Sequence, residues 1–294
     1  AEEEILSDGA TDLVAILTRH DLHARQIVAA LEAGKHVFCE KPPCLDEAEL
    51  EGIVRALAAA GGLGPGGGVE RPGPLFALGY NRRLAPMMLR AREHMAGARE
   101  PLTVQMRINA GAIPLDHWIH DPAVGGGRIV GEVCHFVDLA AFLTGAVPVQ
   151  VHARGVPDRG RYREDNVVLT LTLSDGSVAS IAYVASGDRA LGKERFEMFG
   201  GGRAAVIDDF RVLRLLGGGR ARTERARLAQ DKGHRGEWEA IRRVLTQGGP
   251  PPIEPVSWVA TSLATFAAVR SLRSGAEETV DAAGFLERTT AASA

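Results

Sequence analysis

The sequence predicts an α/β protein: part of a doubly wound parallel sheet, followed by an α+β domain with a mainly antiparallel open sheet. Up to residue 81, short strands that are apolar throughout alternate with helices, which is typical of a parallel sheet covered on both faces. From residue 82, short strands of alternating pattern follow one another, with a strong hairpin signal at Asp175-Gly176. We therefore predict two domains, residues 1–81 and residues 82–294.

In the first domain, apolar runs mark the strands and turn residues mark the helix ends. The expected strands are residues 13–17, 36–39 and 75–78, and the expected helices are residues 21–33 and 46–60. Gly34 ends the first helix and Asp46 can cap the second. Residues 61–74 hold seven Gly and three Pro. We interpret them as a surface loop rather than a phosphate-binding loop, because no helix opens directly after them.

In the second domain, strands punctuated by glycine indicate the antiparallel sheet, and longer apolar-periodic segments indicate helices that pack on it. The expected strands are residues 103–109, 166–173, 177–184, 194–199, 204–207 and 212–216. The expected helices are residues 86–95, 133–143, 235–246 and 258–274. The sequence contains no internal repeat.

Composition excludes several classes of protein. Apolar residues make up 45% of the 294 residues and charged residues 24%, which is ordinary globular composition. The net charge of −3 argues against a nucleic-acid partner, and no apolar stretch is long enough to span a membrane. Three cysteines and no secretory signal favour a cytoplasmic location. Because the sequence does not begin with Met, we expect it to be a fragment.

Lysine is rare in this chain, and one lysine ends a buried strand. Only four of the 34 cationic residues are lysines: Lys35, Lys41, Lys193 and Lys232. Lysine can release its proton when it is desolvated, whereas arginine cannot near neutral pH. Lys41 follows strand 36–39, and Pro42 restricts its backbone. Its amine could donate a hydrogen bond to a substrate oxygen; the alternative is an ordinary surface pair with Glu40.

Two further segments combine polar groups with positions that suit a ligand site. Ligands of doubly wound sheets lie beyond the carboxyl ends of the strands, where strand 13–17 is followed by four polar residues: Thr18, Arg19, His20 and His23. The alternative for His23 is packing inside the helix. In the second segment, His135 and Asp138 lie three residues apart on one helix face, so that Asp138 could orient an imidazole acting as general acid or base. The alternative is a buried histidine with satisfied hydrogen bonds.

Groups suited to hydroxylated ligands also occur in the loop of residues 109–121. From this loop, and from the glycine-rich segment after it, we expect these substrate contacts: Asp116, His117, Trp118, His120 and Arg128. A zinc set of His117, His120, Cys134 and His135, as in a zinc hydrolase, is an alternative, although its spacing matches no usual zinc pattern.

Taken together, these segments resemble a known family. ILTRHDLHARQIVAALEAGKHVFCEKP, LGYNRR and GGGRIVGEVCHFVDLAAFLTG, in this order, are similar to the glucose–fructose oxidoreductase, inositol dehydrogenase and rhizopine-catabolism (Gfo/Idh/MocA) family. The resemblance extends from about residue 11 to 275. NAGAIPLDHW and FGGGRAAVIDDF look most like a subgroup often fused to a zinc-type alcohol dehydrogenase module.

The resemblance implies a Rossmann domain and NAD- or NADP-dependent hydride transfer on a sugar, cyclitol or nucleotide sugar. It places nine residues beside the cofactor or at the mouth of the substrate site: Thr18, Arg19, His20, His23, Glu40, Lys41, Pro42, Asn81 and Arg82. Lys41 and His135 would be the catalytic pair, with Asp138 behind them. The family's first strand, glycine fingerprint and acidic ribose-binding residue would precede residue 1.

One departure puts the usual dyad in doubt. Many family members have Asp four residues before the motif histidine, where this chain has Gly131. Glu132 is displaced by one position, which is about 100° of rotation on a helix, so it need not replace that Asp. A ligand-binding or scaffold protein that lost turnover is therefore the rival interpretation. By analogy with the family, we expect a homodimer or homotetramer formed through the C-terminal sheet.

Overall fold

The computed structural model describes residues 2–64, 68, 73–226 and 229–291. Its N-terminal part is a three-stranded parallel sheet in the order β1 (Leu13–Ile16), β2 (His36–Cys39) and β3 (Phe76–Leu78). Helices α1 (Glu2–Ser7), α2 (His20–Glu32) and α3 (Glu47–Ala59) accompany this sheet. The parallel sheet predicted from the apolar runs is confirmed. Most of the predicted loop 61–74 lies outside the described residues.

The larger part is a nine-stranded sheet with the order β11-β10-β9-β8-β4-β7-β6-β5-β12. Its strands are β4 (Thr103–Asn109), β5 (Pro148–Gly155), β6 (Asn166–Leu173), β7 (Val178–Val184), β8 (Glu194–Gly200), β9 (Arg203–Asp208), β10 (Val212–Gly217), β11 (Arg220–Arg225) and β12 (Glu278–Thr279). All neighbouring pairs are antiparallel except β4 and β7, which run parallel. The predicted hairpin at Asp175-Gly176 joins β6 to β7.

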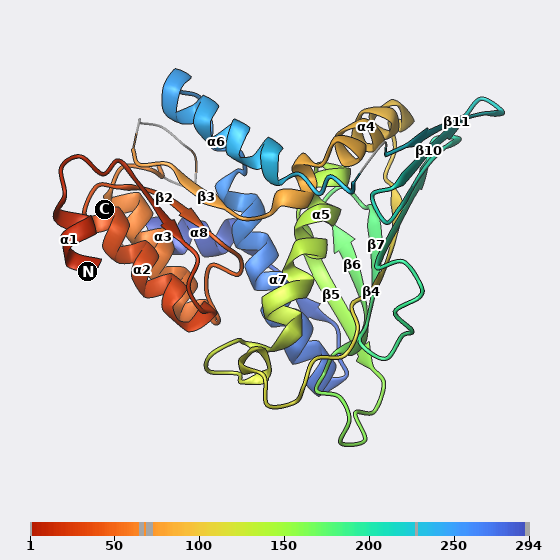
Figure 1. The fold of residues 1–294 in the computed structure, drawn as a ribbon, viewed down its shortest axis with the longest axis horizontal. Coiled ribbons are helices and arrows are strands. Elements are labelled where there is room, and N and C mark those ends of the chain that lie inside the picture. The colour runs from red at the N-terminus through yellow and green to blue at the C-terminus, as the bar shows by residue number, and fades with distance from the viewer. Residues whose placement is uncertain (1, 65–67, 69–72, 227–228, 292–294) are drawn as a thin grey trace.

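Helices α4 (Pro86–Met95), α5 (Cys134–Thr144) and α7 (Pro255–Ser274) cover one face of this sheet. Helix α6 (His234–Gln247) packs instead against the small sheet, where Ile241 joins Phe38 and Ala77 in one apolar cluster, and α8 (Ala282–Ala291) packs against α3 and α7. In Figure 1, α5 and α7 stand between the two sheets, and no helix of the described residues covers the other face of the large sheet. None of the helices in the described ranges is both long and apolar enough to cross a membrane.

Local chemistry explains where several helices begin and end. Asp46 caps α3, because its side chain accepts a hydrogen bond of 2.8 Å from the backbone N–H of Glu49. Pro255 opens α7, where a missing N–H costs nothing, and Gly275 ends it in the left-handed conformation with a φ of 76°.

Sequence reasoning missed strands β5, β11 and β12 and helix α8. In β5 apolar and polar residues alternate from Val149 to Arg154, so its periodicity signal was present and was overlooked, whereas β11 is mostly polar and exposed and gives no such signal. Helix α8 packs against α3 of the first domain, so the chain returns to the small sheet near the end of the described residues. The domain boundary at residue 81 remains a prediction.

The helix that carries the histidine motif begins with a π-helical turn, η5 (Ile129–Val133), which continues directly into α5. Inside this turn, Gly131 packs against two other segments. A Cβ atom on Gly131 would lie 2.9 Å from His20 Cε1 and 2.9 Å from Ile119 Cδ1. A side chain at this position therefore requires His20 and Ile119 to move.

We predict that Gly131→Ala destabilises the protein. Because the added methyl group would overlap two packed side chains, the free energy of unfolding should fall by about 1–3 kcal/mol. Gly52→Ala in α3 is the matched control: no atom lies within 4 Å of its added Cβ, and it should be neutral or stabilising by up to about 1 kcal/mol. Urea denaturation followed by circular dichroism measures both. A Gly131→Ala variant as stable as the parent would contradict the packing described.

Candidate functional site

A cavity of about 70 Å³ lies where the two parts of the protein meet. Lys41 enters it from the segment after β2, and the other lining residues come from the larger part. The lining residues are Lys41, Arg82, Ile108, Glu132, His135, Phe136, Tyr183 and Lys193. The structure thus brings Lys41 and His135 together, 94 positions apart in the sequence.

The position of Lys41 is fixed from both sides of the junction. Its Nζ atom donates a hydrogen bond of 2.7 Å to the carbonyl oxygen of Gly131 in the π-helical turn. The peptide bond between Lys41 and Pro42 is cis. Because Lys41 is half-buried and lines the cavity, its ammonium group is available to a ligand as a hydrogen-bond donor.

His135 is buried in the first turn of α5, and its Nδ1 atom has no hydrogen-bond partner among the described residues. Burial lowers the pKa of His135 well below its usual value, and the nearby positive charges of Arg82, Lys41 and Lys193 lower it further. The imidazole is therefore neutral near pH 7 and can accept a proton.

Asp138 does not orient this imidazole, contrary to the sequence-based expectation. Its carboxylate forms two hydrogen bonds with the buried Arg83, of 3.0 Å from Nε and 2.5 Å from Nη2. Burial raises the pKa of Asp138 although Arg83 opposes the shift. Asp138 therefore joins α5 to the short helix η2 (Asn81–Leu84) and leaves His135 without a carboxylate partner.

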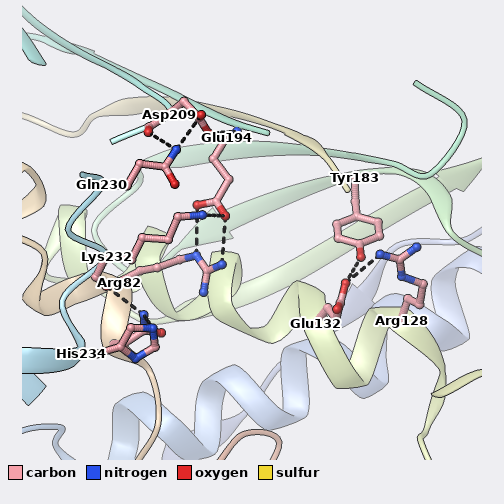
Figure 2. A network of polar contacts seen from close by, with 10 residues as sticks. Arg82, Arg128, Glu132, Tyr183, Glu194, Asp209, Gln230, Lys232 and His234 are labelled. Carbon is pink, nitrogen blue, oxygen red and sulfur yellow. Dashed lines mark hydrogen bonds and ion pairs between the residues drawn. The ribbon is translucent and has the colours of Figure 1, made fainter. Parts of the chain in front are cut away.

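Glu132 lines the cavity together with His135, three residues later, which is the spacing of two residues on one helix face. Glu132 accepts hydrogen bonds from Arg128 (2.9 Å) and from the Tyr183 hydroxyl (Figure 2). Burial opposes its ionisation, but Arg128 and Tyr183 outweigh this and lower the pKa of Glu132 to about 2. It is a permanent carboxylate at neutral pH.

Arg128 is only 2% exposed and binds internal partners. The expectation that Arg128 contacts the substrate is therefore wrong. Besides Glu132, it binds the carbonyl oxygen of Gly111 at 2.7 Å and lies 3.6 Å from an oxygen of Asp165. Its guanidinium group also stacks over the Tyr183 ring, 5.0 Å from the centroid. Arg128 positions Glu132 and Tyr183 from behind the cavity.

A second network holds the other wall of the cavity (Figure 2). Glu194, fully buried at the start of β8, accepts hydrogen bonds from Arg82 (2.9 and 3.1 Å) and from Lys232 (2.9 Å). Asn81, expected beside the cofactor, instead donates a hydrogen bond of 2.8 Å to the carbonyl oxygen of Lys232. This network ties the segment before α6 to the sheet and fixes Arg82 at the cavity.

The polar residues after β1 divide into exposed and buried ones. Thr18 and Arg19 are exposed and remain accessible to a ligand. The fully buried His23 hydrogen-bonds the carbonyl oxygens of Pro42 (2.7 Å) and Thr18 (3.0 Å), so it joins the two loops at the carboxyl ends of β1 and β2. His20 is likewise buried and hydrogen-bonds the carbonyl oxygen of Gly125 at 2.8 Å. The contacts of both histidines are therefore those of internal packing, and we do not assign either of them a direct contact with the cofactor.

Of the loop of residues 109–121, which was expected to bind the substrate, only part lies near the histidines that follow β1. Trp118 packs edge-on against His20, with ring centroids 4.9 Å apart, while Asp116 and His117 are exposed. His120 is buried and lines a different cavity from His135. In the described part of the chain, no group of three or more His, Cys, Asp or Glu side chains is placed to hold a metal ion.

Sequence reasoning missed four residues of the cavity, the apolar Ile108 and Phe136 and the polar Tyr183 and Lys193. Tyr183 is an ordinary buried aromatic residue at the end of a strand, and no local pattern marks it. Lys193 did carry a signal, because it is one of only four lysines in an arginine-rich chain.

Comparisons with known proteins agree with this architecture. Residues 2–63 match the model of the oxidoreductase family with an NAD-binding Rossmann fold, and residues 98–203 match the GFO/IDH/MocA C-terminal domain. The 1,5-anhydro-D-fructose reductase of Ensifer adhaerens is 29% identical over 187 residues, which are 60% of this chain and 51% of the relative. The inositol 2-dehydrogenase of Rhizobium meliloti is 29% identical over 182 residues, 58% of this chain and 49% of the relative.

The solved structure of a levoglucosan dehydrogenase in complex with NADH and levoglucosan has the same fold. It superposes with a TM-score of 0.78 at 20% identity, covering 95% of this chain and 82% of that one. The chain spans about half the length of the two curated relatives described above. Because the two family models together match more than half of the residues, in the order of the fold, the protein belongs to the Gfo/Idh/MocA family of oxidoreductases.

Proposed function

We propose that this protein is an NAD(P)-dependent dehydrogenase or reductase that acts on the CH–OH group of a sugar, a cyclitol or a nucleotide sugar. The observation that carries the proposal is the shared cavity of Lys41 and His135. The substrate class is supported by two relatives, a 1,5-anhydro-D-fructose reductase and an inositol 2-dehydrogenase. The NADH bound to the levoglucosan dehydrogenase supports the cofactor class.

The residues around the cavity fit a nicotinamide cofactor beside a hydroxylated substrate. Lys41 lies beyond the carboxyl end of β2, the edge at which doubly wound sheets bind nucleotides. The buried Nδ1 of His135 has no partner in the described ranges, and such an orphaned polar atom suits a ligand hydroxyl. Glu40 and Pro42, which flank Lys41, would hold the nicotinamide side, with Thr18 and Arg19 along the same edge.

In this mechanism, the bound cofactor supplies the hydride acceptor for oxidation and the hydride donor for reduction. During oxidation, His135 accepts the proton of the substrate hydroxyl while Lys41 donates a hydrogen bond to the same oxygen. During reduction, the protonated imidazole returns that proton. Glu132 does not carry a proton, because its pKa of about 2 keeps it ionised.

A small-molecule substrate, a reducing cytoplasm and a homo-oligomer complete the proposal. Cys39, Cys44 and Cys134 are all free and buried, as expected in a reducing compartment. The helix-free face of the large sheet exposes Val168 (50%), Val178 (40%) and Phe199 (40%). Val178 and Phe199 flank the same residue of β4, so they form one apolar patch that a second copy could cover.

We predict that Lys41→Ala abolishes turnover while the fold persists. Loss of the donor to the reacting oxygen should lower kcat/KM at least about 100-fold, measured at 340 nm in the full chain with a panel of sugars and cyclitols. Lys35→Ala is the matched control, because Lys35 donates only to the carbonyl oxygen of Asp8 on the surface. Normal turnover by Lys41→Ala would refute the mechanism. A parent protein that oxidises or reduces no member of the panel would favour the scaffold interpretation.

We predict that oxidation persists below the ordinary pKa of histidine. Since burial and neighbouring cations lower the pKa of His135, its imidazole stays neutral as the pH falls through 6.5, and kcat/KM should decline only at lower pH. The same shift makes the unfolded state bind more protons than the folded state below pH 6.5, so the free energy of unfolding falls as the pH falls. Measurements of kcat/KM and of urea unfolding over the same pH range test both statements. An acid limb centred at or above pH 6.5 would contradict the assignment.

We predict that charge on the apolar patch dissociates the oligomer. Phe199→Arg would bury an unpaired cation at the interface, so the mass measured by light scattering should fall toward that of one chain. Leu89→Arg, at an exposed position of α4, is the control and should leave the mass unchanged. A parent protein that is already a monomer would exclude this assembly.

A further inference from the structure

We propose that the substrate of this site carries an anionic group, a carboxylate or a phosphate, and that Lys193 binds it. The inference rests on the proposed function, because it takes the ligand of the cavity to be the substrate. It narrows the substrate to acidic or phosphorylated members of the sugar and cyclitol class.

The cavity has an excess of positive charge. Three cationic residues line it, Lys41, Arg82 and Lys193, against one carboxylate, Glu132. That carboxylate is already paired with Arg128 at 2.9 Å behind the cavity wall. The one carboxylate of the lining therefore does not offset its three positive charges.

Arg82 does not share this excess, because it has its own partner. The buried carboxylate of Glu194 binds both Arg82 and Lys232, each at 2.9 Å. Lys41 is engaged by the carbonyl oxygen of Gly131 and, in the proposed mechanism, by the reacting oxygen of the substrate. The remaining cation is Lys193, whose ammonium group has no hydrogen bond or ion pair with any residue that the structure describes.

The backbone of Lys193 is held rigidly although its side chain is exposed. The N–H of Asn109 donates a hydrogen bond of 2.7 Å to the Lys193 carbonyl oxygen, and Arg107 donates one of 2.7 Å to the preceding residue, Gly192. The following residue is the buried Glu194. Asp209, a neighbouring carboxylate, is turned to Gln230 (2.6 Å) and to the N–H of Glu194 (3.2 Å). A fixed backbone thus presents an unpaired cation at the cavity rim.

The lowered pKa of His135 indicates that the positive charge of Lys193 acts on the proposed reaction site. Its pKa is lowered first by burial and then by Arg82, Lys41 and Lys193. A positive potential that disfavours a proton on His135 also favours a negative group on a ligand. An anionic substituent at Lys193 would form a charge-assisted hydrogen bond, which is stronger than a neutral one.

The test is binding to the full chain by isothermal titration calorimetry, with sugars that differ in one charge. Matched pairs are D-glucuronate with D-glucose and D-galacturonate with D-galactose, and D-glucose 6-phosphate forms the phosphate arm. We expect an anionic sugar to bind about tenfold more tightly than its neutral partner at low salt. The preference should shrink as salt is added, since the contact lies at the exposed rim. Tighter binding of the uronates assigns a carboxylate, and tighter binding of the 6-phosphate assigns a phosphate.

Lys193→Gln should remove this preference, while Lys35→Gln, which changes the net charge equally on a remote surface, should retain it. In ligand-free protein, Lys193→Gln should also raise the pKa of His135 measured by NMR. Equal or absent binding of charged and neutral partners would overturn the proposal, as would equal effects of the two lysine substitutions or an unchanged His135 pKa. If anion binding depends on Lys193 but the absorbance at 340 nm does not change when the cofactor is added, hydride transfer is refuted. The proposal that Lys193 binds an anionic group is then retained.

Discussion

The hydrogen bond from Lys41 Nζ to the carbonyl oxygen of Gly131 joins the two parts of the protein at the site. It links the carboxyl end of a parallel strand to a π-helical turn 90 positions later in the chain, across 2.7 Å. At the same residue the π-helical turn packs closely on the segments around it, because a Cβ atom on Gly131 would meet His20 and Ile119 at 2.9 Å. Gly131 therefore accepts the hydrogen bond of Lys41 through its carbonyl oxygen and lets His20 and Ile119 approach its Cα atom.

The π-helical turn contributes an acidic side chain to the cavity. Its Glu132 lies there with His135, and Arg128 and Tyr183 hold the carboxylate in place. A negative charge paired with Arg128 is therefore fixed at the cavity wall.

Arginine and lysine have separate tasks around this cavity. Three carboxylates near it are each paired with an arginine: Glu132 with Arg128, Asp138 with Arg83 and Glu194 with Arg82. A planar guanidinium group can hold a carboxylate through two hydrogen bonds, as Arg82 and Arg83 do here. Lys232 is a second partner of Glu194. Lys41 and Lys193, whose ammonium groups have no carboxylate partner among the described residues, line the space that a ligand would occupy.

The sequence alone determined the regular elements and the two domain types. Helix 86–95 and strands 103–109 and 166–173 were predicted to the residue, because their periodicity and end signals are local properties of the chain. The order of the motifs also identified the family and singled out Lys41 and His135.

Only the tertiary structure decided how the side chains pair. Asp138 binds Arg83 rather than His135, Arg128 points inward, and His120 lies in another cavity. The π-helical turn and the contribution of Tyr183 gave no signal in the sequence, and the rarity of lysine did not show where Lys193 would lie. These outcomes depend on competition between partners that are distant in the chain, and local spacing carries no information about which buried charge another segment will bring.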